Sequence, residues 1–297
     1  MRLLLAAAAV AAGSAVWSAA AVEQQNADAI SWLQRIYSAT DHLSYVGTFV
    51  YQRGEQVETS RITRLVDSKG VHERLETLDG TPREILRFND EVKCYLPQTM
   101  TLKIDQQLNS VPFPAMQANA RELADYYQIR KGETERIAGY DCQSIVLEPK
   151  DSLRYGHKLW ADINTGMLMK AKTFNEKNEV VEQFAFTQLQ IGGKIRRGQV
   201  RSRYAGKGRD WRIERSGMEP ADLASRGWLL AVLPPGYKKV TEMKRNVGTT
   251  VDVGHIVLSD GLAAVSVFIE PLADRPAPPR LGLSRDGAVS VWDRREC

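Results

Sequence analysis

Residues that could do chemistry are few and scattered in this chain. Its three cysteines, Cys94, Cys142 and Cys297, and its four histidines lack the C-x-x-C or H-E-x-x-H spacing of a metal site. The sequence also has no G-x-S-x-G nucleophile elbow, no phosphate-binding P-loop and no dinucleotide-binding glycine motif. Glu133 and Glu135 form an acidic pair near a strand start, where a solvated face is the simpler explanation. We therefore expect a binding protein rather than an enzyme, with no cofactor and no metal ion.

The N-terminus indicates export. A charged start, Met1-Arg2, precedes an apolar run, Leu3–Ala12, and the small residues around Ala19–Ala21 fit the pattern that a signal peptidase cleaves. The run is shorter than the roughly 18 apolar residues that a membrane-spanning helix needs. Residues 1–21 are therefore predicted to be a cleavable secretion signal, with an uncleaved anchor as the alternative.

Export bears on the cysteines, because disulfides persist outside the cytoplasm. Cys94 and Cys142 lie in strand-like segments, Glu91–Leu96 and Tyr140–Leu147, where a bridge could join two strands. Such a bridge would stabilise the fold by about 4 kcal/mol through loop-closure entropy. We expect this disulfide, with two separate buried thiols as the alternative.

Two helices and many short strands must position these residues. Apolar residues at helical spacing predict one helix over Asn26–Thr40 and another over Ala115–Tyr127. β-Branched and aromatic runs between tight-turn residues predict eleven strands. These are Tyr45–Gln52, Val57–Asp67, Val71–Leu78, Arg83–Asn89, Glu91–Leu96, Thr99–Ile104, Tyr127–Lys131, Glu135–Pro149, His157–Asp162, Leu168–Asn175 and Val180–Gln190. The expected fold is α+β and mainly β: one large, curled antiparallel sheet with helices over one face.

The net charge of the whole chain, +4, argues neither for nucleic acid nor for an acidic surface as partner. Its distribution is uneven, because apolar periodicity disappears between Gly192 and Arg209. We interpret residues 193–209 as a basic linker between a domain at 22–192 and another at 210–297. Its basic residues can attract phosphates or an acidic partner, and a solvated linker explains them equally well. They are Lys194, Arg196, Arg197, Arg201, Arg203, Lys207 and Arg209.

The second domain is predicted to be smaller and also antiparallel. The tight-turn dipeptide Asp260-Gly261 separates His255–Leu258 from Leu262–Glu270, whose side chains alternate, so we expect a hairpin here. A proline-rich stretch then leads to a final strand, Ala288–Trp292.

Several segments resemble the RseB/MucB family, in order along nearly the whole chain after the signal. They are Ser31–Arg35, Tyr45–Tyr51, Arg154–Trp160, Asp162–Ala171, Glu182–Phe184, Leu233–Tyr237 and Ser259–Glu270. The resemblance implies a first domain shaped as an unclosed β-barrel, similar to the lipoprotein carriers LolA and LolB. It also implies a periplasmic negative regulator of the sigma-E envelope-stress response. Such a protein binds the periplasmic part of a membrane-spanning anti-sigma factor, shields it from proteolysis and releases it when lipid or lipopolysaccharide binds.

The resemblance also suggests where ligands would lie. Apolar candidates for a lipid cavity are Phe49, Tyr51, Leu86, Phe88, Tyr95, Trp160, Phe184 and Phe186. Candidates for the anti-sigma contact are His255, Ser259, Asp260, Gly261 and Phe268, with ordinary sheet structure as the alternative.

Family members continue beyond the strand at Ala288–Trp292 with further strands and a helix. We therefore expect the second domain to be incomplete, with an open edge at that strand. A lipid or lipoprotein carrier that uses the first domain alone is the alternative function. A homo-oligomer is compatible with the sequence.

Overall fold

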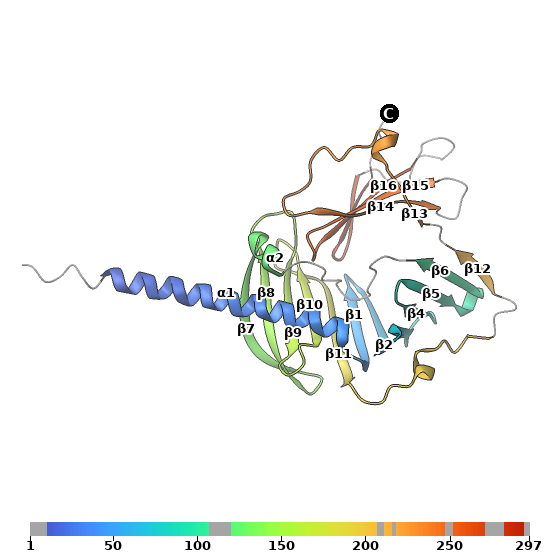
Figure 1. Cartoon of the computed structure of the whole chain (residues 1–297), viewed down its shortest axis with the longest axis horizontal. Coiled ribbons are helices and arrows are strands. Elements are labelled where there is room, and N and C mark those ends of the chain that lie inside the picture. The colour runs from blue at the N-terminus through green and yellow to red at the C-terminus, as the bar shows by residue number, and fades with distance from the viewer. Residues whose placement is uncertain are drawn as a thin grey trace, which may run out of the picture.

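The computed structural model describes residues 11–106, 120–206, 211–215, 218–246, 252–270 and 282–293. The first domain contains the helices α1 (Ala11–His42) and α2 (Ala120–Tyr126) and a large sheet (Figure 1). The strands of this sheet are β1 (Tyr45–Arg53), β2 (Gln56–Asp67), β3 (Gly70–Thr77), β4 (Glu84–Phe88), β5 (Glu91–Leu96), β6 (Thr101–Gln106), β7 (Tyr127–Ile137), β8 (Tyr140–Pro149), β9 (Gly156–Asp162), β10 (Leu168–Phe174), β11 (Val180–Ile191) and β12 (Arg212–Arg215).

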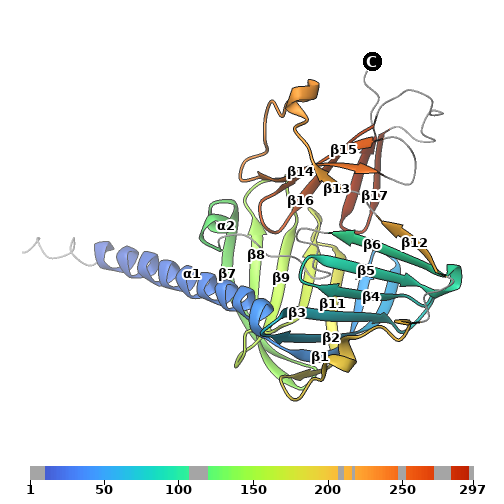
Figure 2. The same cartoon turned by 45° about the vertical axis from the view of Figure 1, so that its right-hand side comes forward.

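The large sheet consists of two meanders joined at one pair of strands. Its order is β12-β6-β5-β4-β3-β2-β1-β11-β10-β9-β8-β7, so β1 of the first meander pairs with β11 of the second. All these pairings are antiparallel except that of β12 with β6, which is parallel. Figure 2 shows the sheet curling without closing into a barrel. The predicted fold class, mainly β with one large curled sheet, is confirmed.

The predicted strands coincide with β1–β11 except around β7 and β8. The sequence suggested a break at residues 132–134, but the structure has only a bulge there, between Lys131 and Thr134. The chain instead turns at Ala138 and Gly139, whose φ angles are 48° and 90°. Positive φ at both central residues is the geometry of the tight hairpin turn that matches strand twist. Alanine at the first of these positions gave no turn signal in the sequence.

The opening helix is longer than predicted. It was expected to begin at Asn26, whereas α1 begins at Ala11 and passes through the predicted cleavage site. From Trp32 to Ile36 its apolar side chains are buried against the sheet. No helix in the described part of the chain is long and apolar enough to cross a membrane. The second predicted helix corresponds to α2, and its expected first residues, 115–119, lie outside the described residues.

Strand register assigns each side chain to one of the two faces of the sheet. We call the side with α1 the helix face and the other the outer face. On the helix face, Phe49 pairs with Phe186, and Tyr51 pairs with Phe184. The rings of Phe49, Phe184 and Phe186 lie 5.4–5.9 Å apart in edge-to-face contacts. These rings belong to the core that α1 covers.

The basic stretch after β11 lies against the outer face rather than in solvent. Arg197 binds Asp67 through two guanidinium nitrogens, at 2.8 and 2.9 Å. Ser202 donates a hydrogen bond to Glu84, and Val200 is buried. We call residues 193–206 the strap. Sheet pairing continues beyond the predicted domain boundary, because β12 adds a strand to the first sheet.

The second domain has a small sheet of its own. Its strands are β13 (Met218–Pro220), β14 (Lys238–Asn246), β15 (Asp252–Ser259) and β16 (Ala264–Ile269), in that order, followed by a separate hairpin of β17 (Gly282–Asp286) and β18 (Val289–Asp293). The expected hairpin around Asp260-Gly261 is the β15–β16 pair. The buried core of the second domain consists of Leu223, Tyr237, Ile256 and Leu258.

The expected disulfide is absent from the structure. Cys94 on β5 and Cys142 on β8 are both free. Strand order explains this, because seven strands separate β5 from β8 in the sheet. The third cysteine, Cys297, lies outside the described residues.

Candidate functional site

The tip of the β15–β16 hairpin is held in a fixed shape by its own side chains. Ser259 Oγ donates to the carbonyl of Ala263 at 2.8 Å and accepts from the amide of Gly261 at 2.9 Å. Asp260 Oδ1 accepts from the amides of Leu262 and Ala263, at 2.9 and 2.7 Å. One carboxylate oxygen of Asp260 therefore closes the turn, and the other, Oδ2, remains available for a contact outside it.

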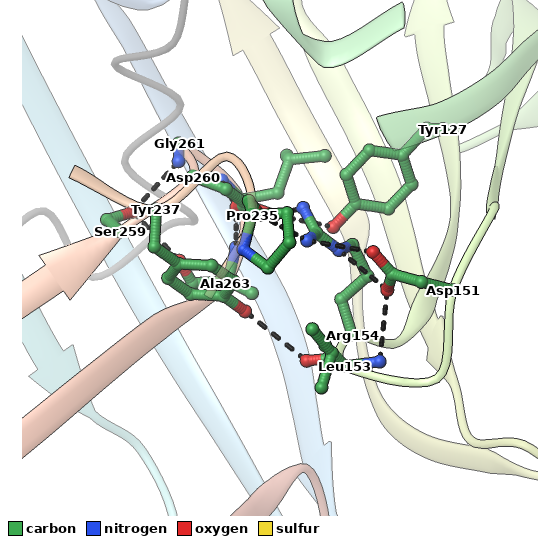
Figure 3. A network of polar contacts seen from close by, with 11 residues as sticks. Tyr127, Asp151, Leu153, Arg154, Pro235, Tyr237, Ser259, Asp260, Gly261 and Ala263 are labelled. Atoms are coloured by element: carbon green, nitrogen blue, oxygen red, sulfur yellow. Dashed lines mark hydrogen bonds and ion pairs between the residues drawn. The ribbon is translucent and has the colours of Figure 1, made fainter. Parts of the chain in front are cut away.

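Asp260 Oδ2 forms an ion pair with the first domain (Figure 3). Arg154 Nη1, in the loop between β8 and β9, donates to it at 2.7 Å, and both side chains are fully buried. The hydroxyl of Tyr127, the first residue of β7, donates to the same oxygen at 3.2 Å. A buried carboxylate is costly unless it is paired and hydrogen-bonded, and here it is both.

The Arg154 guanidinium joins segments from both domains. Its Nη2 donates to the carbonyl of Pro235 in the second domain at 2.7 Å, and its Nε donates to Asp151 in its own loop at 3.0 Å. Three tyrosine rings surround it, with the guanidinium carbon 4.9–5.7 Å from their centroids. These rings belong to Tyr126, Tyr127 and Tyr237. Planar guanidinium groups stack well on such rings and can donate in several directions at once.

The surroundings of this site keep Arg154 protonated and the tyrosines Tyr127 and Tyr237 neutral. Burial opposes the charge of Arg154, but Asp151 and Asp260 together raise its pKa. Burial, and next the charge of Asp260, raises the pKa of Tyr237 to about 12. The pKa of Tyr127 is raised for the same two reasons. Tyr127 can thus act as a hydrogen-bond donor over the whole physiological pH range.

The approach of the second domain depends on Gly236. A Cβ atom at this position would lie 2.6–2.8 Å from the Tyr126 ring, and φ is 81°, so only glycine fits without strain. Next to it, Tyr237 donates to the carbonyl of Leu153 at 3.4 Å. At the rim, Lys238 pairs with Glu122 of α2 at 2.5 Å, and both of these side chains are exposed.

The hairpin tip also reaches the helix face of the first domain. Leu262 packs against the large core that contains the rings of Phe49, Phe184 and Phe186. Asp260 contributes to the raised pKa of Tyr37 on α1, after burial, and opposes the lowering of the His157 pKa on β9. The tip therefore lies close to α1, β7 and β9 at once. We call the group of Arg154, Asp260 and Tyr127 the interdomain latch.

The latch is suited to binding and positioning rather than to catalysis. It contains an always-charged guanidinium, a fully paired carboxylate and neutral phenols, with no activated nucleophile beside a base. No group of three or more His, Cys, Asp or Glu side chains that could hold a metal ion occurs within the described ranges.

The predicted lipid-cavity residues lie on two different faces. Phe49, Tyr51, Phe184 and Phe186 share the helix face. Register puts the other four, Leu86, Phe88, Tyr95 and Trp160, on the outer face, because they pair with Arg74, His72, Glu84 and Lys170. A single cavity cannot contain all eight. The sequence could not assign the faces, because a period-two pattern shows which residues of a strand share a face but not which face packs against the helices.

The predicted partner-contact residues also divide into two groups. The turn residues Ser259, Asp260 and Gly261 form the hairpin tip, and Asp260 is buried against the first domain. His255 stacks on Phe268, with ring centroids 4.2 Å apart and an interplanar angle of 15°. The side chain of Phe268 is 53% exposed. His255 itself is buried, so the Phe268 ring is the part of the candidate surface that is still accessible to a partner.

Sequence reasoning missed the first-domain half of the latch. Arg154 and Tyr127 are separated from Asp260 by more than a hundred residues in the chain, and no local pattern links them. The one signal was the Pro-Pro-Gly-Tyr segment, Pro234–Tyr237, whose turn residues bring the Pro235 carbonyl to Arg154.

The fold and the latch define a two-domain β protein built for binding, in which the hairpin tip of a second, smaller domain packs against a large open sheet. Residues 28–204 match the MucB/RseB N-terminal domain family, and residues 222–296 match the MucB/RseB C-terminal domain family. The chain therefore belongs to the MucB/RseB family of sigma-factor regulatory proteins.

Two relatives illustrate the extent of the match. The sigma factor AlgU regulatory protein MucB of Pseudomonas aeruginosa is 34% identical over 251 residues, which is 84% of this chain and 76% of the relative. The sigma-E factor regulatory protein RseB of Haemophilus influenzae is 23% identical over 269 residues, 88% of this chain and 81% of the relative.

Solved structures are also similar over most of the chain. The Pseudomonas aeruginosa MucA/MucB complex matches with a TM-score of 0.65 and 30% identity, covering 88% of this chain and 85% of that one. A crystal structure of MucB in complex with MucA(peri) matches with a TM-score of 0.61 and 30% identity, covering 86% and 82%.

Proposed function

We propose that this protein is a periplasmic regulator that binds the periplasmic region of a sigma-E-type anti-sigma factor. In this role it protects the anti-sigma factor from regulated proteolysis and releases it when lipid or lipopolysaccharide binds. The observation that carries the proposal is the likeness to MucB across both domains, because MucB has been solved in complex with MucA.

The accessible face of the small sheet supports a partner contact there. The Phe268 ring lies half-exposed at its surface and stacks on the buried His255, and a half-exposed aromatic ring of this kind is a common anchor at protein interfaces. The turn residues of the same hairpin contribute indirectly, by fixing the orientation of the small sheet relative to the large one.

The latch supports a way for lipid to release the partner. The helix face carries the four aromatic candidates, and Leu262 of the second domain packs against the core on that face. An acyl chain that entered beside these rings would compete with Leu262 for the same apolar surface. Because Leu262 and Asp260 belong to one tight turn, displacing the first also strains the Arg154–Asp260 ion pair. Lipid would then bind more tightly when the second domain is displaced than when it is docked. This difference in affinity is what allows lipid binding to shift the position of the second domain.

The direct test is co-elution of the purified chain with the purified periplasmic fragment of the anti-sigma factor from the same genome. We expect the two proteins to form a complex, and this complex should slow cleavage of the fragment by the protease that starts its degradation. Lipopolysaccharide should dissociate the complex. A matched pair of variants locates the surface: Phe268→Ala should weaken the complex about tenfold or more, as removal of a central aromatic anchor does. Phe88→Ala, an exposed aromatic ring of the first sheet, should leave it unchanged.

Absence of any complex at micromolar concentration would count against the function. A complex that forms but is insensitive to lipopolysaccharide would retain the partner and reject the release mechanism.

A further inference from the structure

A second charged site lies on the outer face of the large sheet, where β9 and β10 pair. In their register Lys172 lies opposite Lys158, and Lys170 lies opposite Trp160. Directly opposite residues of an antiparallel pair point to the same side, so these four side chains share the outer face. We call Lys158, Lys170 and Lys172 the lysine cluster.

The side chains around the cluster bring its ammonium groups together. The Nζ atoms of Lys158 and Lys170 lie 4.7 and 4.4 Å from the centroid of the buried Trp160 ring. The same two atoms lie 3.5 and 3.9 Å from the two carboxylate oxygens of Glu135 on β7. Two ammonium groups are thus held over one ring and beside one carboxylate.

The cluster has more positive charge than its neighbours neutralise. Like charges directly opposite each other destabilise a sheet. Lys158 and Lys172 are such a pair, so they repel each other. Burial lowers the pKa of Lys170, the charge of Lys172 lowers it further, and Glu135 opposes both effects. Glu135 is the one carboxylate at ion-pair distance from the cluster in the part of the chain that the structure describes. Three lysines therefore share one acid, which leaves two uncompensated charges.

We propose that the lysine cluster binds a phosphate dianion, either free phosphate or the phosphomonoester headgroup of a lipid. A dianion matches the two uncompensated charges. Its tetrahedral oxygens can accept from several ammonium groups at once, whereas a planar carboxylate is better matched by the fork of an arginine. The inference is independent of the proposed function, because it involves neither the anti-sigma contact nor the helix face.

Calorimetric titration of the full chain with inorganic phosphate tests the site. Lys158→Met, Lys170→Met and Lys172→Met should each weaken phosphate binding by about tenfold, the effect of losing one charged contact. Glu135→Gln removes the competing carboxylate and should strengthen binding severalfold. Lys177→Met, in the exposed turn between β10 and β11, is the matched control and should change nothing.

Thermal unfolding separates ligand binding from a purely structural role. Lys172→Met relieves the repulsion with Lys158 and should raise the melting temperature by about 2 °C. If the cluster binds an anion, the same variant should also weaken phosphate binding. If the lysines serve only to cover Trp160, the Met variants alter the melting temperature and leave phosphate affinity unchanged. That second result overturns the proposal.

Vesicles distinguish the two sources of the dianion. Sedimentation with vesicles containing phosphatidic acid, a phosphomonoester, is compared with phosphatidylglycerol, a phosphodiester, at equal mole fraction. Cluster-dependent binding to phosphatidic acid supports a lipid headgroup, and binding to inorganic phosphate without vesicle binding supports free phosphate. Equal binding to both vesicles, or equal competition by polyglutamate, overturns the proposal because it reveals a general attraction to negative charge.

Discussion

At the scale of single residues, the fold strongly opposes protonation of His157. It lies on β9 with Nε2 buried and without a hydrogen-bond partner among the described residues. Burial lowers the pKa of His157 to about 4, although the charge of Asp260 opposes the shift. The folded chain therefore contains a neutral imidazole from neutral pH down to well below pH 6. In the unfolded chain this group titrates near pH 6.5.

This shift makes stability depend on pH in a known direction. The unfolded state binds a proton between pH 6.5 and 4 and the folded state does not, so stability is full above pH 6.5 and falls as pH decreases through this window. We expect the free energy of unfolding to decrease by about 2 kcal/mol from pH 7.5 to pH 5 because of His157. Urea titrations at the two pH values measure it, and His157→Gln should remove that part of the decrease.

The matched control is His42→Gln, at the exposed C-terminal end of α1. It should retain the full decrease of the unmodified chain. Equal pH dependence in His157→Gln and the unmodified chain would show that His157 is not the group responsible.

The two described cysteines make a separate prediction about reactivity. Burial, followed by the nearby charge of Asp162, raises the pKa of Cys142 to about 11. Burial also raises the pKa of Cys94. Because the thiolate is the reactive form, native Cys142 should be alkylated by iodoacetamide at pH 8 far more slowly than a free thiol. After denaturation without reductant, both residues should react fully by peptide mass spectrometry, and protection of both would indicate the disulfide that the structure lacks.

At the scale of elements, the strap shows how a segment without apolar periodicity can be ordered by charge. Glu76 and Glu84 are directly opposite each other on β3 and β4, and both are buried. Arg74 pairs with each of them, at 2.9 and 2.7 Å, and Arg203 of the strap pairs with Glu76. Two adjacent buried carboxylates would repel each other without these arginines, so the strap contributes charge that β3 and β4 need.

Protease sensitivity checks the attachment of the strap. The strap is rich in lysine and arginine, yet we expect trypsin to cleave it slowly in the native chain because its residues are bound to the sheet. Arg203→Gln should accelerate cleavage at Arg197 and Arg201 severalfold, because Glu76 loses a partner and the strap loses an anchor. Lys194→Gln, in the same strap and without an ion pair in the described structure, should not. Rapid cleavage of the unmodified strap would contradict the arrangement.

The sequence was informative where structure is local and much less so where it is not. Period-two patterns and turn dipeptides located β1–β11 and the β15–β16 hairpin, because each depends on neighbours a few residues away. The strap looked like a linker because its partners, Asp67 and Glu84, lie on distant strands. The sequence also could not show which face of the sheet each aromatic residue occupies, because alternation groups residues by face without saying which face is covered.

At the scale of the whole molecule, the Arg154–Asp260 pair is the contact on which the arrangement of the two domains most depends. Removal of one partner from a fully buried pair leaves an uncompensated charge, with a typical cost of 3–5 kcal/mol. Among the described residues, the other ion pairs between the domains are Lys238–Glu122, Arg53–Asp286 and Arg285–Glu176, and their side chains are exposed or nearly so. We therefore expect loss of the buried pair to separate the domains.

Small-angle scattering and double-mutant analysis test this expectation. Arg154→Met and Asp260→Asn should each increase the radius of gyration and split thermal unfolding into two transitions. Lys238→Gln is the matched control, since its exposed pair with Glu122 should contribute less than about 1 kcal/mol. The effects of the two latch variants should be strongly non-additive, because each abolishes the same contact. Additive effects would indicate that the two residues act separately.

The single seam between β1 and β11 determines how this protein can fold. Each meander forms from neighbouring segments, but the seam pairs Tyr45 with Ile191 and therefore closes a very long loop. Contacts this far apart in sequence are entropically costly to form and slow a folding reaction. A chain that emerges N-terminus first must therefore keep the inner edge of β1 unpaired until β11 is complete. During that interval the exposed edge is the part of the molecule most prone to aggregation.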